Sequence, residues 1–289
     1  MFVDPRWALV LRGPTSIKKC YLDEKMFKGL KSSLPVFWRL LYVDLLIFKP
    51  MYSGRLIDYF IYVSLMVLIM GYLLTGFGVR PDFGMFTAAT LVGTSGMFDV
   101  FPRAVAIVSD LTGSLVISYD LTLPISCWLA IVRMGISNAI RCVSLSIFAL
   151  PFGLLFVYPQ FNSAHVSWGW FFALLVSNAL IYGFFSIFLS SVIENMSKIG
   201  SMWIRVVFPL WMLGGFQFTW EMMYAKSPLL AYVLLLNPFL YTTEGMRGAI
   251  LGQAGSLPTA MCFFAGLFFA GLYGSIGVLR LLRRLDAVR

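Results

Sequence analysis

The sequence predicts an all-helical integral membrane protein, and its composition and the length of its apolar runs support that prediction. Hydrophobic residues make up 60% of the 289 residues and charged residues only 12%, whereas a soluble domain carries roughly a quarter charged residues. Apolar runs of about 20 residues, the length that crosses roughly 30 Å of hydrocarbon as a helix, recur along the chain. A β-barrel of alternating strands of about ten residues does not produce such runs. We therefore expect a bundle of transmembrane helices.

The formal net charge of +9 is unevenly placed along the chain. Ten of the 22 Lys and Arg residues lie between Arg6 and Arg55. Four more follow the last apolar run, at Arg280, Arg283, Arg284 and Arg289. Because Lys and Arg gather on the cytoplasmic side of a membrane, both termini are expected in the cytoplasm and the number of spans is expected to be even. We interpret the charge as an orientation signal, with anionic membrane lipids as neighbours and no nucleic-acid partner.

Residues 1–34 are expected to form a basic cytoplasmic tail. Apolar residues recur there at helical spacing among lysines, at Leu22, Met26, Phe27 and Leu30. This pattern favours an amphipathic helix on the inner membrane surface, and a solvated tail with little structure is the alternative. The chain start is too polar and its apolar core too short for a cleaved signal peptide, so we expect it to be retained.

Residues 36–49, between Pro35 and Pro50, are apolar but too short to cross the bilayer. They predict an interfacial helix. On a helical projection, Asp44 points away from the two basic residues of this segment. We therefore expect the Asp44 carboxylate to contact protein and not lipid tails.

Six spans are predicted in the transmembrane domain, which is expected to occupy residues 35–289. Their approximate bounds are residues 56–75, 84–108, 128–158, 168–189, 202–218 and 257–281. Tryptophans at the ends of the fourth and fifth spans are typical of residues anchored at the membrane interface.

Four charged residues lie inside or beside the second and third spans. Asp99 and Arg103 stand four residues apart, the spacing at which an acid and a base pair on one helix face. Arg133 and Arg141 lie near the start of the third span and are expected to reach lipid headgroups or carboxylates.

Residues 110–126 form a polar segment between the second and third spans. Their hydroxyls, carboxylates and turn-prone backbone cannot lie in hydrocarbon, so the segment must face water. We interpret it as a short cytoplasmic helix that docks on another protein, with an ordinary solvated loop as the alternative. Asp110 is suited to cap this helix, and Tyr119 and Asp120 offer an aromatic and a charged contact. The candidate contact residues are Asp110, Gly113, Ser114, Tyr119, Asp120, Thr122 and Pro124.

Residues 219–255 lie between the fifth and sixth spans and contain two apolar runs too short to cross the bilayer. Asn237-Pro238 separates them, which predicts two short helices in a hairpin that enters the outer leaflet and returns. Glu244 and Arg247 are expected to pair and hold the hairpin, with contact to a transported molecule as the alternative. The candidate residues are Asn237, Pro238, Tyr241, Glu244 and Arg247.

The sequence contains no recognisable catalytic or metal-binding pattern. The four cysteines show no paired spacing and His165 is the single histidine, so no metal cluster or Cys/His catalytic pair is predicted. The phosphate-binding pattern G-x-x-x-x-G-K-[ST] does not occur either. We expect no enzymatic activity and no bound cofactor in this chain.

The order of these parts resembles that of the membrane subunits of type-2 ATP-binding-cassette exporters. The resemblance covers roughly residues 36–284. GSLVISYDLTLPIS, at residues 113–126, is similar to the coupling segment of that family. LNPFLYTTEGMRGAIL, at residues 236–251, is similar to its Asn-Pro-x-x-Tyr pattern with a closing Arg.

The resemblance implies a permease that works with a separate ATPase. Two permease chains, identical or different, would pair with two ATPase subunits that bind ATP and Mg²⁺, in a bacterial plasma (inner) membrane. The aromatic and Met-rich bundle is compatible with an amphipathic or hydrophobic cargo such as a lipid-linked glycan, a lipid or a drug.

Two other function classes are weighed against a permease. A membrane-embedded lipid-modifying enzyme needs a polar catalytic cluster at one depth, and the dispersed carboxylates do not supply one. An ion-coupled secondary carrier often has interrupted helices in both halves, whereas here the interruption falls in the second half.

Overall fold

The computed structural model describes residues 30–78, 81–114, 116–120, 122–158, 161–252 and 255–287. All regular structure in these ranges is helical. The helices that are long and apolar enough to cross a membrane are Ser33–Gly76, Phe83–Ser109, Cys127–Val157, Trp168–Val192 and Thr259–Leu285. Such helices are those of a multi-pass membrane protein, as the composition predicts. The predicted basic tail lies almost entirely outside the described residues.

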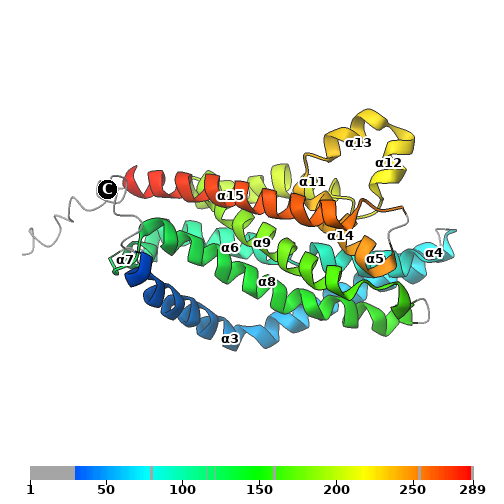
Figure 1. Ribbon diagram of the computed structural model, residues 1–289, viewed down its shortest axis with the longest axis horizontal. Helices are drawn as coiled ribbons and strands as arrows, with labels where there is room; N and C mark the ends of the chain where they lie inside the picture. The colour runs from blue at the N-terminus through cyan, green and yellow to red at the C-terminus, as the bar shows by residue number, and fades with distance from the viewer. Residues whose placement is uncertain are drawn as a thin grey trace, which may run out of the picture.

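The first long helix is continuous where the sequence predicts two separate helices. Helix α3 (Leu30–Leu68) includes both Pro35 and Pro50, and it continues through a π-helix (Ile69–Leu73) into α4 (Leu74–Gly76). A proline inside a helix removes one backbone hydrogen bond and bends the helix without having to end it. Figure 1 shows α3 changing direction along its length, so the break expected near residue 50 is a bend.

The second predicted span consists of α5 (Phe83–Thr94) and α6 (Met97–Ser109), joined by a short turn. A π-helix (Asp110–Ser114) and the short helix α7 (Val116–Asp120) follow. Gly96 in the turn lies so close to Tyr182 that a Cβ atom there would be 2.3 Å from the tyrosine ring. The second span is thus interrupted where α9 passes against it.

Helices α8 (Cys127–Val157), α9 (Trp168–Val192) and α15 (Thr259–Ala287) form the centre of the bundle. Helix α9 packs along both α8 and α15, and α3 lies against α8. Glycines permit this close packing, because a Cβ at Gly183 would lie 2.5 Å from the Gly135 carbonyl oxygen and one at Gly277 would lie 2.9 Å from the Phe188 nitrogen.

The fifth predicted span is shorter than expected. It consists of α10 (Ile199–Met202), a π-helix (Trp203–Val207) and α11 (Phe208–Met212). The helix ends at Met212 because the chain turns at Gly215, which has a φ of 77°. It is therefore shorter than the roughly 20 residues that cross a bilayer. Among the described residues there are five stretches of helix long enough to cross a membrane and this short one, where six full spans are predicted.

Three short helices occupy the region where two are predicted. They are α12 (Trp220–Lys226), α13 (Pro228–Leu234) and α14 (Pro238–Leu251). The Thr219 side chain accepts a hydrogen bond from the Met222 N–H and so caps α12, and Asn237 caps α14 in the same way. Helices α12 and α13 project from the bundle in Figure 1, whereas α14 packs against α5, α9 and α15 and is buried along nearly its whole length.

The two ends of the bundle carry different elements. Figure 1 shows α7, the start of α3 and the end of α15 at one end, and α4, α12 and α13 at the other. We call these the α7 end and the α12 end.

The contact between α5 and α14 leads to a stability prediction. A Cβ at Gly93 would lie 2.3 Å from the Thr242 carbonyl oxygen, so Gly93→Ala forces two backbones apart. We expect this substitution to lower stability by about 1–3 kcal/mol, the usual cost of overpacking. Gly169→Ala is the control, because a Cβ there has no neighbour within 4 Å. Thermal unfolding of the purified full-length chain in detergent measures both, and equal melting temperatures would contradict the prediction.

Candidate functional site

The polar segment at the α7 end is fixed by a side chain at its own start. The Asp110 carboxylate accepts a hydrogen bond from the Ile117 backbone N–H at 2.7 Å, in the first turn of α7. Capping of this kind satisfies a backbone donor that a helix start leaves free. The carboxylate therefore holds the short helix against the π-helical turn that precedes it.

Arg133 connects α7 to two long helices. Its Nη2 atom lies 2.6 Å from Asp120 Oδ2 on α7, and its Nη1 atom lies 3.4 Å from Asp44 Oδ2 on α3. Arg133 itself belongs to α8 and is 5% exposed. The two carboxylates neutralise the charge of the buried guanidinium, and charge-assisted contacts of this kind are strong. Asp44 thus contacts protein, and one side chain of α8 ties the neighbouring helix α7 and the distant helix α3 together.

Arg141, two turns further along α8, also reaches α3. Its Nη2 atom donates to the Asp44 carbonyl oxygen at 2.7 Å, and its guanidinium lies 4.8 Å from the centre of the Phe48 ring. The sequence left open whether the α8 arginines contact lipid headgroups or carboxylates. Arg133 contacts carboxylates. Arg141 contacts a backbone carbonyl and an aromatic ring.

A small cavity of about 190 Å³ lies within this charged region. Its charged lining residues are three acids and three arginines: Asp44, Asp110, Asp120, Arg103, Arg133 and Arg141. The Nε atoms of the three arginines are buried without a hydrogen-bond partner among the described residues. The cavity is roomy enough for several water molecules and polar enough to hold them. We call these six residues and their cavity the Arg133 cluster.

Arg103 belongs to the Arg133 cluster and does not form the predicted pair with Asp99. Asp99 is buried in the first turn of α6 and lies 3.8 Å from Arg55 of α3, at Oδ1 and Nη1. No Asp99–Arg103 ion pair occurs in the described part of the chain. The four-residue spacing allows that pair, but Asp99 faces α3 and Arg103 lines the cavity beside Asp44 and Asp110. The two side chains therefore form no direct ion pair, although each is the strongest opposite charge acting on the other.

The outer side of the α7 segment is open. Tyr119 is 66% exposed, and Gly113, Thr122 and Pro124 are exposed too. The Thr122 hydroxyl donates to the Tyr119 carbonyl oxygen at 2.7 Å, which tightens the turn after α7. The side chain of Ser114 lies outside the described ones. The segment is thus anchored through Asp110 and Asp120 and presents Gly113, Tyr119, Thr122 and Pro124 outward.

The inner side of the same segment is apolar. Ile125 and Leu129 form a small buried cluster with Phe37 and Leu41 of α3. This packing was not predicted, although the alternation of apolar and polar residues at 123–126 is a signal that could have indicated it. Ile117 of α7 itself packs with Ile107 and Ile131 in a separate buried cluster, so both α7 and the chain after it are held by apolar contacts as well as by the ion pairs.

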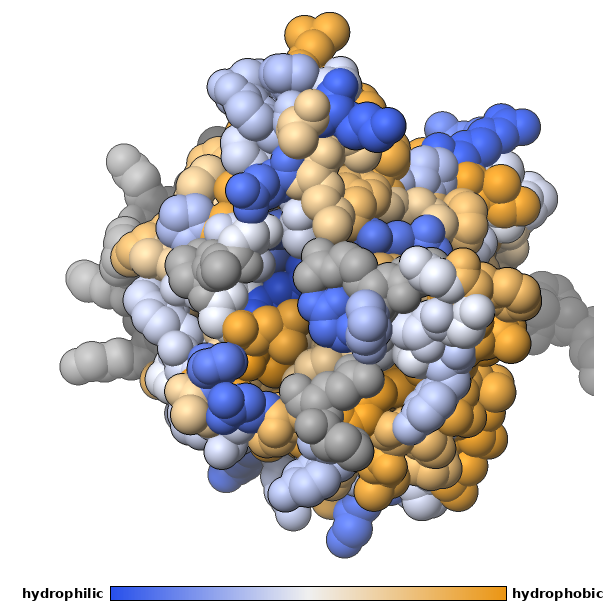
Figure 2. All heavy atoms as spheres, turned by 90° about the vertical axis from the view of Figure 1, so that its right-hand side faces the viewer, coloured by the Kyte–Doolittle hydropathy of each residue, from blue (hydrophilic) through white to orange (hydrophobic). Residues whose placement is uncertain are grey.

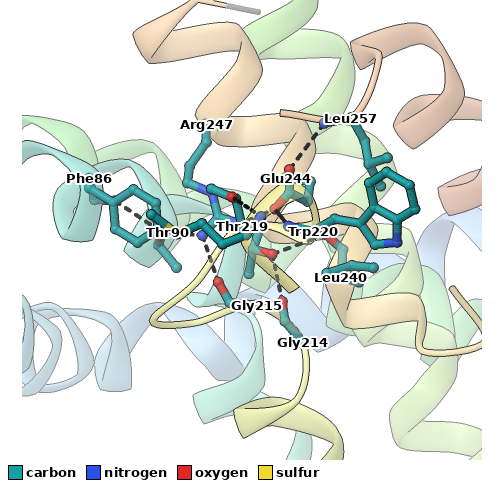
Figure 3. Close-up of polar contacts among 12 residues, drawn as sticks. Phe86, Thr90, Gly214, Gly215, Thr219, Trp220, Leu240, Glu244, Arg247 and Leu257 are labelled. Carbon is teal, nitrogen blue, oxygen red and sulfur yellow. Dashed lines mark hydrogen bonds and ion pairs between the residues drawn. The ribbon is translucent and has the colours of Figure 1, made fainter. Parts of the chain in front are cut away.

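A second polar cluster lies near the α12 end (Figure 3). Arg247 Nη2 lies 2.5 Å from Glu244 Oε1, and both residues are almost completely buried on α14. Arg247 also donates to the Gly215 carbonyl oxygen at 2.6 Å and to the Thr90 hydroxyl at 3.2 Å. Its guanidinium lies 4.5 Å from the centre of the Phe86 ring. Arg247 therefore attaches α14 to α5 and to the turn after α11.

Glu244 attaches the same helix to two further elements. Its Oε1 atom accepts from the Trp220 N–H at 2.9 Å and its Oε2 atom accepts from the Leu257 N–H at 3.1 Å. Figure 3 shows these contacts converging from α12 and from the chain that leads into α15. The pair thus joins the short helices to the bundle, which fits the predicted holding role.

The other predicted residues of this region satisfy backbone groups. The Asn237 side chain donates to the Leu210 carbonyl oxygen at 2.6 Å and accepts from the Phe239 N–H at 3.1 Å. Tyr241 donates from its hydroxyl to the Leu235 carbonyl oxygen at 2.8 Å, and Pro238 opens α14 where no N–H is needed. These contacts hold the chain reversal between α13 and α14.

A cavity of about 440 Å³ opens at the α12 end, with Arg247 in its lining. Figure 2 looks onto this end and shows hydrophilic residues in a recess near the centre of the face. Asp82 and Glu221 also line the cavity. Among the described residues, no group of three or more His, Cys, Asp or Glu side chains could hold a metal ion.

Comparison with known proteins does not assign the chain to a class. No protein-family model matches it, and no curated protein matches it. Its function must therefore be argued from the order of its parts and from the two polar clusters.

The Glu244–Arg247 pair leads to a second prediction. Glu244→Gln leaves a buried guanidinium without its carboxylate, which typically costs about 3–5 kcal/mol, so we expect a large fall in the melting temperature of the full-length chain. The control is Glu194→Gln, which removes the exposed ion pair with Lys198. An exposed pair contributes little, so this variant should melt like the wild type.

The control pair also has a defined pH dependence. The hydrogen bond from Lys198 lowers the pKa of Glu194. Any contribution from the pair to stability is therefore present at neutral pH and is lost as the pH falls through that lowered pKa.

The comparison of the two variants is made at pH 7. If Glu244→Gln and Glu194→Gln melted at the same temperature there, the role assigned to Glu244 would be contradicted.

The Arg133 cluster leads to a third prediction. Removing Arg133 alone, as Arg133→Gln, leaves two partly buried carboxylates without this cation. Replacing Asp120 by Asn in the same chain removes one of the stranded charges, so the double variant should recover about 0.5–3 kcal/mol relative to the sum of the single changes. A thermodynamic cycle of melting measurements checks this, and additive effects would show that the two side chains do not interact.

Proposed function

We propose that this chain is the permease subunit of an ATP-driven exporter of the type-2 ATP-binding-cassette class. It resides in a bacterial plasma (inner) membrane with both termini in the cytoplasm and forms the translocation pathway. The observation that carries this proposal is α7, a short helix that exposes Tyr119 and is bound through Asp120 and Arg133 to two long helices at the end of the bundle where α15 ends. A protein that pushes on α7 from outside the membrane would move α3 and α8 with it.

The exposed face of the α7 segment is the proposed docking surface. Tyr119, Thr122 and Pro124 face outward, whereas the apolar residues beneath them pack on α3. An aromatic ring surrounded by polar groups is typical of an interface anchor. Asp120, predicted as a direct contact, serves in this proposal as the link to Arg133.

The energy source is assigned to the partner. The chain lacks the phosphate-binding pattern of an ATPase, so in this proposal ATP and Mg²⁺ bind to the docked subunit and this chain needs no cofactor of its own. Two ATPase subunits act on two permease chains, as a homodimer or a heterodimer. Closure of the ATPases moves the two α7 segments.

The short helices at the α12 end are proposed to lie in the outer leaflet as a re-entrant hairpin. Large apolar side chains are exposed on and just after α13, including Leu229, Tyr232, Val233 and Leu236. A patch of this kind is unusual on a surface in water and normal on one in contact with lipid. The Glu244–Arg247 pair keeps the hairpin joined to the bundle while the hairpin borders the exit of the pathway.

The cargo is proposed to be amphipathic or hydrophobic, such as a lipid-linked glycan, a lipid or a drug. The support for this is compositional, because aromatic residues make up 17% of the chain and methionine occurs 15 times. Aromatic faces accept both sugar rings and hydrocarbon.

The docking surface leads to the fourth prediction. Tyr119→Glu places a charge on the proposed contact and should abolish copurification of an ATPase subunit with the tagged full-length chain, without changing the chain's melting temperature. Tyr158→Glu is the matched control, because Tyr158 is similarly exposed, at 70%, near the opposite end of α8. It should retain the partner.

Two outcomes would contradict the proposed function. One is ATP hydrolysis by the purified chain alone. The other is transport by the chain in vesicles that contain an ion gradient but no ATPase, which is the behaviour of an ion-coupled carrier.

A further inference from the structure

Two charged side chains stand exposed within the predicted membrane spans. Asp58 lies in α3, in a stretch of helix long and apolar enough to cross a membrane. Arg205 lies in the π-helix Trp203–Val207, between α10 and α11. The ion pairs among the described residues include neither side chain. Charged residues within membrane spans almost always pair with one another or face the bundle interior or a water-filled cavity, so both charges require an explanation.

The surroundings of the two charges are apolar. Ile57 and Ile61 are exposed on α3, and Ile204 and Phe208 are exposed beside Arg205. Surfaces of this kind are normally covered by hydrocarbon or by protein and not by water. Each charge is therefore set in a surface that does not solvate it.

Asp58 lies at the edge of α3 that borders α6. The ring of Tyr62, one helical turn after Asp58, has its centre 4.2 Å from that of Phe98 on α6. Asp58 and Tyr62 are separated by about 40° around the helix. Arg55, three residues before Asp58, lies 3.8 Å from Asp99 of α6 and forms no ion pair with Asp58 in the described part of the chain. Asp58 is thus turned outward beside α6.

Arg205 lies on the other flank of α6, at a similar level. The ring of Trp203, two residues before Arg205, has its centre 5.0 Å from that of Phe101 on α6. In Figure 1, α6 lies between α3 and α11. The ring contacts of α6 with its two neighbours place Asp58 and Arg205 within about one helical turn of each other along the bundle.

We propose that two copies of this chain pair through these charges, with Asp58 of each copy against Arg205 of the other. A two-fold interface makes every such contact twice, because residue i meets residue j and residue j meets residue i. The pairing lays α3 of one copy along the π-helix Trp203–Val207 of the other and encloses the exposed side of α6 between them. The inference rests on the proposed function in that two permease chains pair, and it specifies that the two chains are identical.

A lipid is a less suitable partner for the two charges together. An anionic headgroup suits Arg205 but repels Asp58 at the same level. A second copy of the chain supplies an acid for the one and a base for the other at once. Charge complementarity therefore favours a copy of this chain.

The first test is disulfide crosslinking in membranes between two full-length chains with different tags. One chain carries Asp58→Cys and the other carries Arg205→Cys. We expect an oxidant to produce a dimer that contains both tags. Each variant expressed with the wild-type chain should produce no such dimer, because neither residue lies against its own counterpart.

The matched control for crosslinking is Ile57→Cys combined with Arg205→Cys. Ile57 is exposed at the same level but lies about 100° from Asp58 around α3. This pair should crosslink much less than the Asp58 pair.

The second test exchanges the charges. Arg205→Asp alone places two acids together and should lower the association constant of the chains in vesicles about 2–150-fold, measured by energy transfer between labelled chains. Adding Asp58→Arg to the same chain should restore association. Lys226→Asp is the control, because Lys226 is exposed on α12 and forms no ion pair with the described residues. It should associate like the wild type.

Three results would overturn the pairing: a monomeric wild-type chain, crosslinking from Ile57 as strong as from Asp58, or a double charge variant that associates no better than Arg205→Asp. The proposed function is tested separately. Dimers that form through these residues but never copurify with an ATPase subunit would contradict the proposed function and support the interface. An ATPase subunit that copurifies with the chain, without crosslinking between Asp58→Cys and Arg205→Cys, would do the reverse.

Discussion

The buried guanidinium of Arg133 is the contact on which the arrangement of the α7 end depends. Asp44, Asp120 and Arg133 come from three helices, and each of the two ion pairs places a charge of one helix against the surface of another. Buried ion pairs add little net stability, but the loss of one member is costly because it leaves an unpaired charge. The pairs therefore specify how α3, α7 and α8 meet more than they strengthen the fold.

The two polar clusters differ in what surrounds their charges. Near the α12 end, both carboxylate oxygens of Glu244 accept backbone N–H groups and Arg247 has a carboxylate, a carbonyl, a hydroxyl and an aromatic ring around it. In the Arg133 cluster, three carboxylates and three guanidinium groups line one small cavity. Each of the four arginines has a buried Nε atom without a hydrogen-bond partner among the described residues. The cluster near the α12 end is thus held largely through backbone groups, and the Arg133 cluster largely through opposite charges.

The sequence predicted the features that depend on local chemistry. Long apolar runs identified the five long helices, and Asn237-Pro238 identified the start of α14 because the side-chain cap and the missing N–H act within a few residues. Features that depend on distant partners were missed. The four-residue spacing of Asp99 and Arg103 could not reveal that Asp99 faces Arg55 across a helix interface.

Helix continuity was missed for a related reason. The sequence marks Pro50 as a boundary, but whether a helix ends or bends at a proline depends on the packing on either side. Similarly, α11 ends at Met212 because Gly215 adopts a positive φ that Arg247 and Thr243 then fix through the carbonyl oxygens of Gly215 and Gly214. Only the assembled bundle brings those side chains to the turn.

The continuity of α3 gives the bundle a mechanical link between its ends. Asp44 contacts Arg133 near the α7 end, and Gly71 lies against Gly84 of α5, where an added Cβ would be 2.9 Å from the Gly84 Cα. These two contacts are 27 residues apart, about 40 Å along a helix. The regular α-helix is interrupted twice over this length. Pro50 lies between the two contacts, and Gly71 itself belongs to the π-helix Ile69–Leu73. The start of α5, which packs against this helix, also holds Phe86 and Thr90 against Arg247. Because α5 contacts both α3 and α14, it connects the Arg133 cluster to the Glu244–Arg247 pair through helix packing.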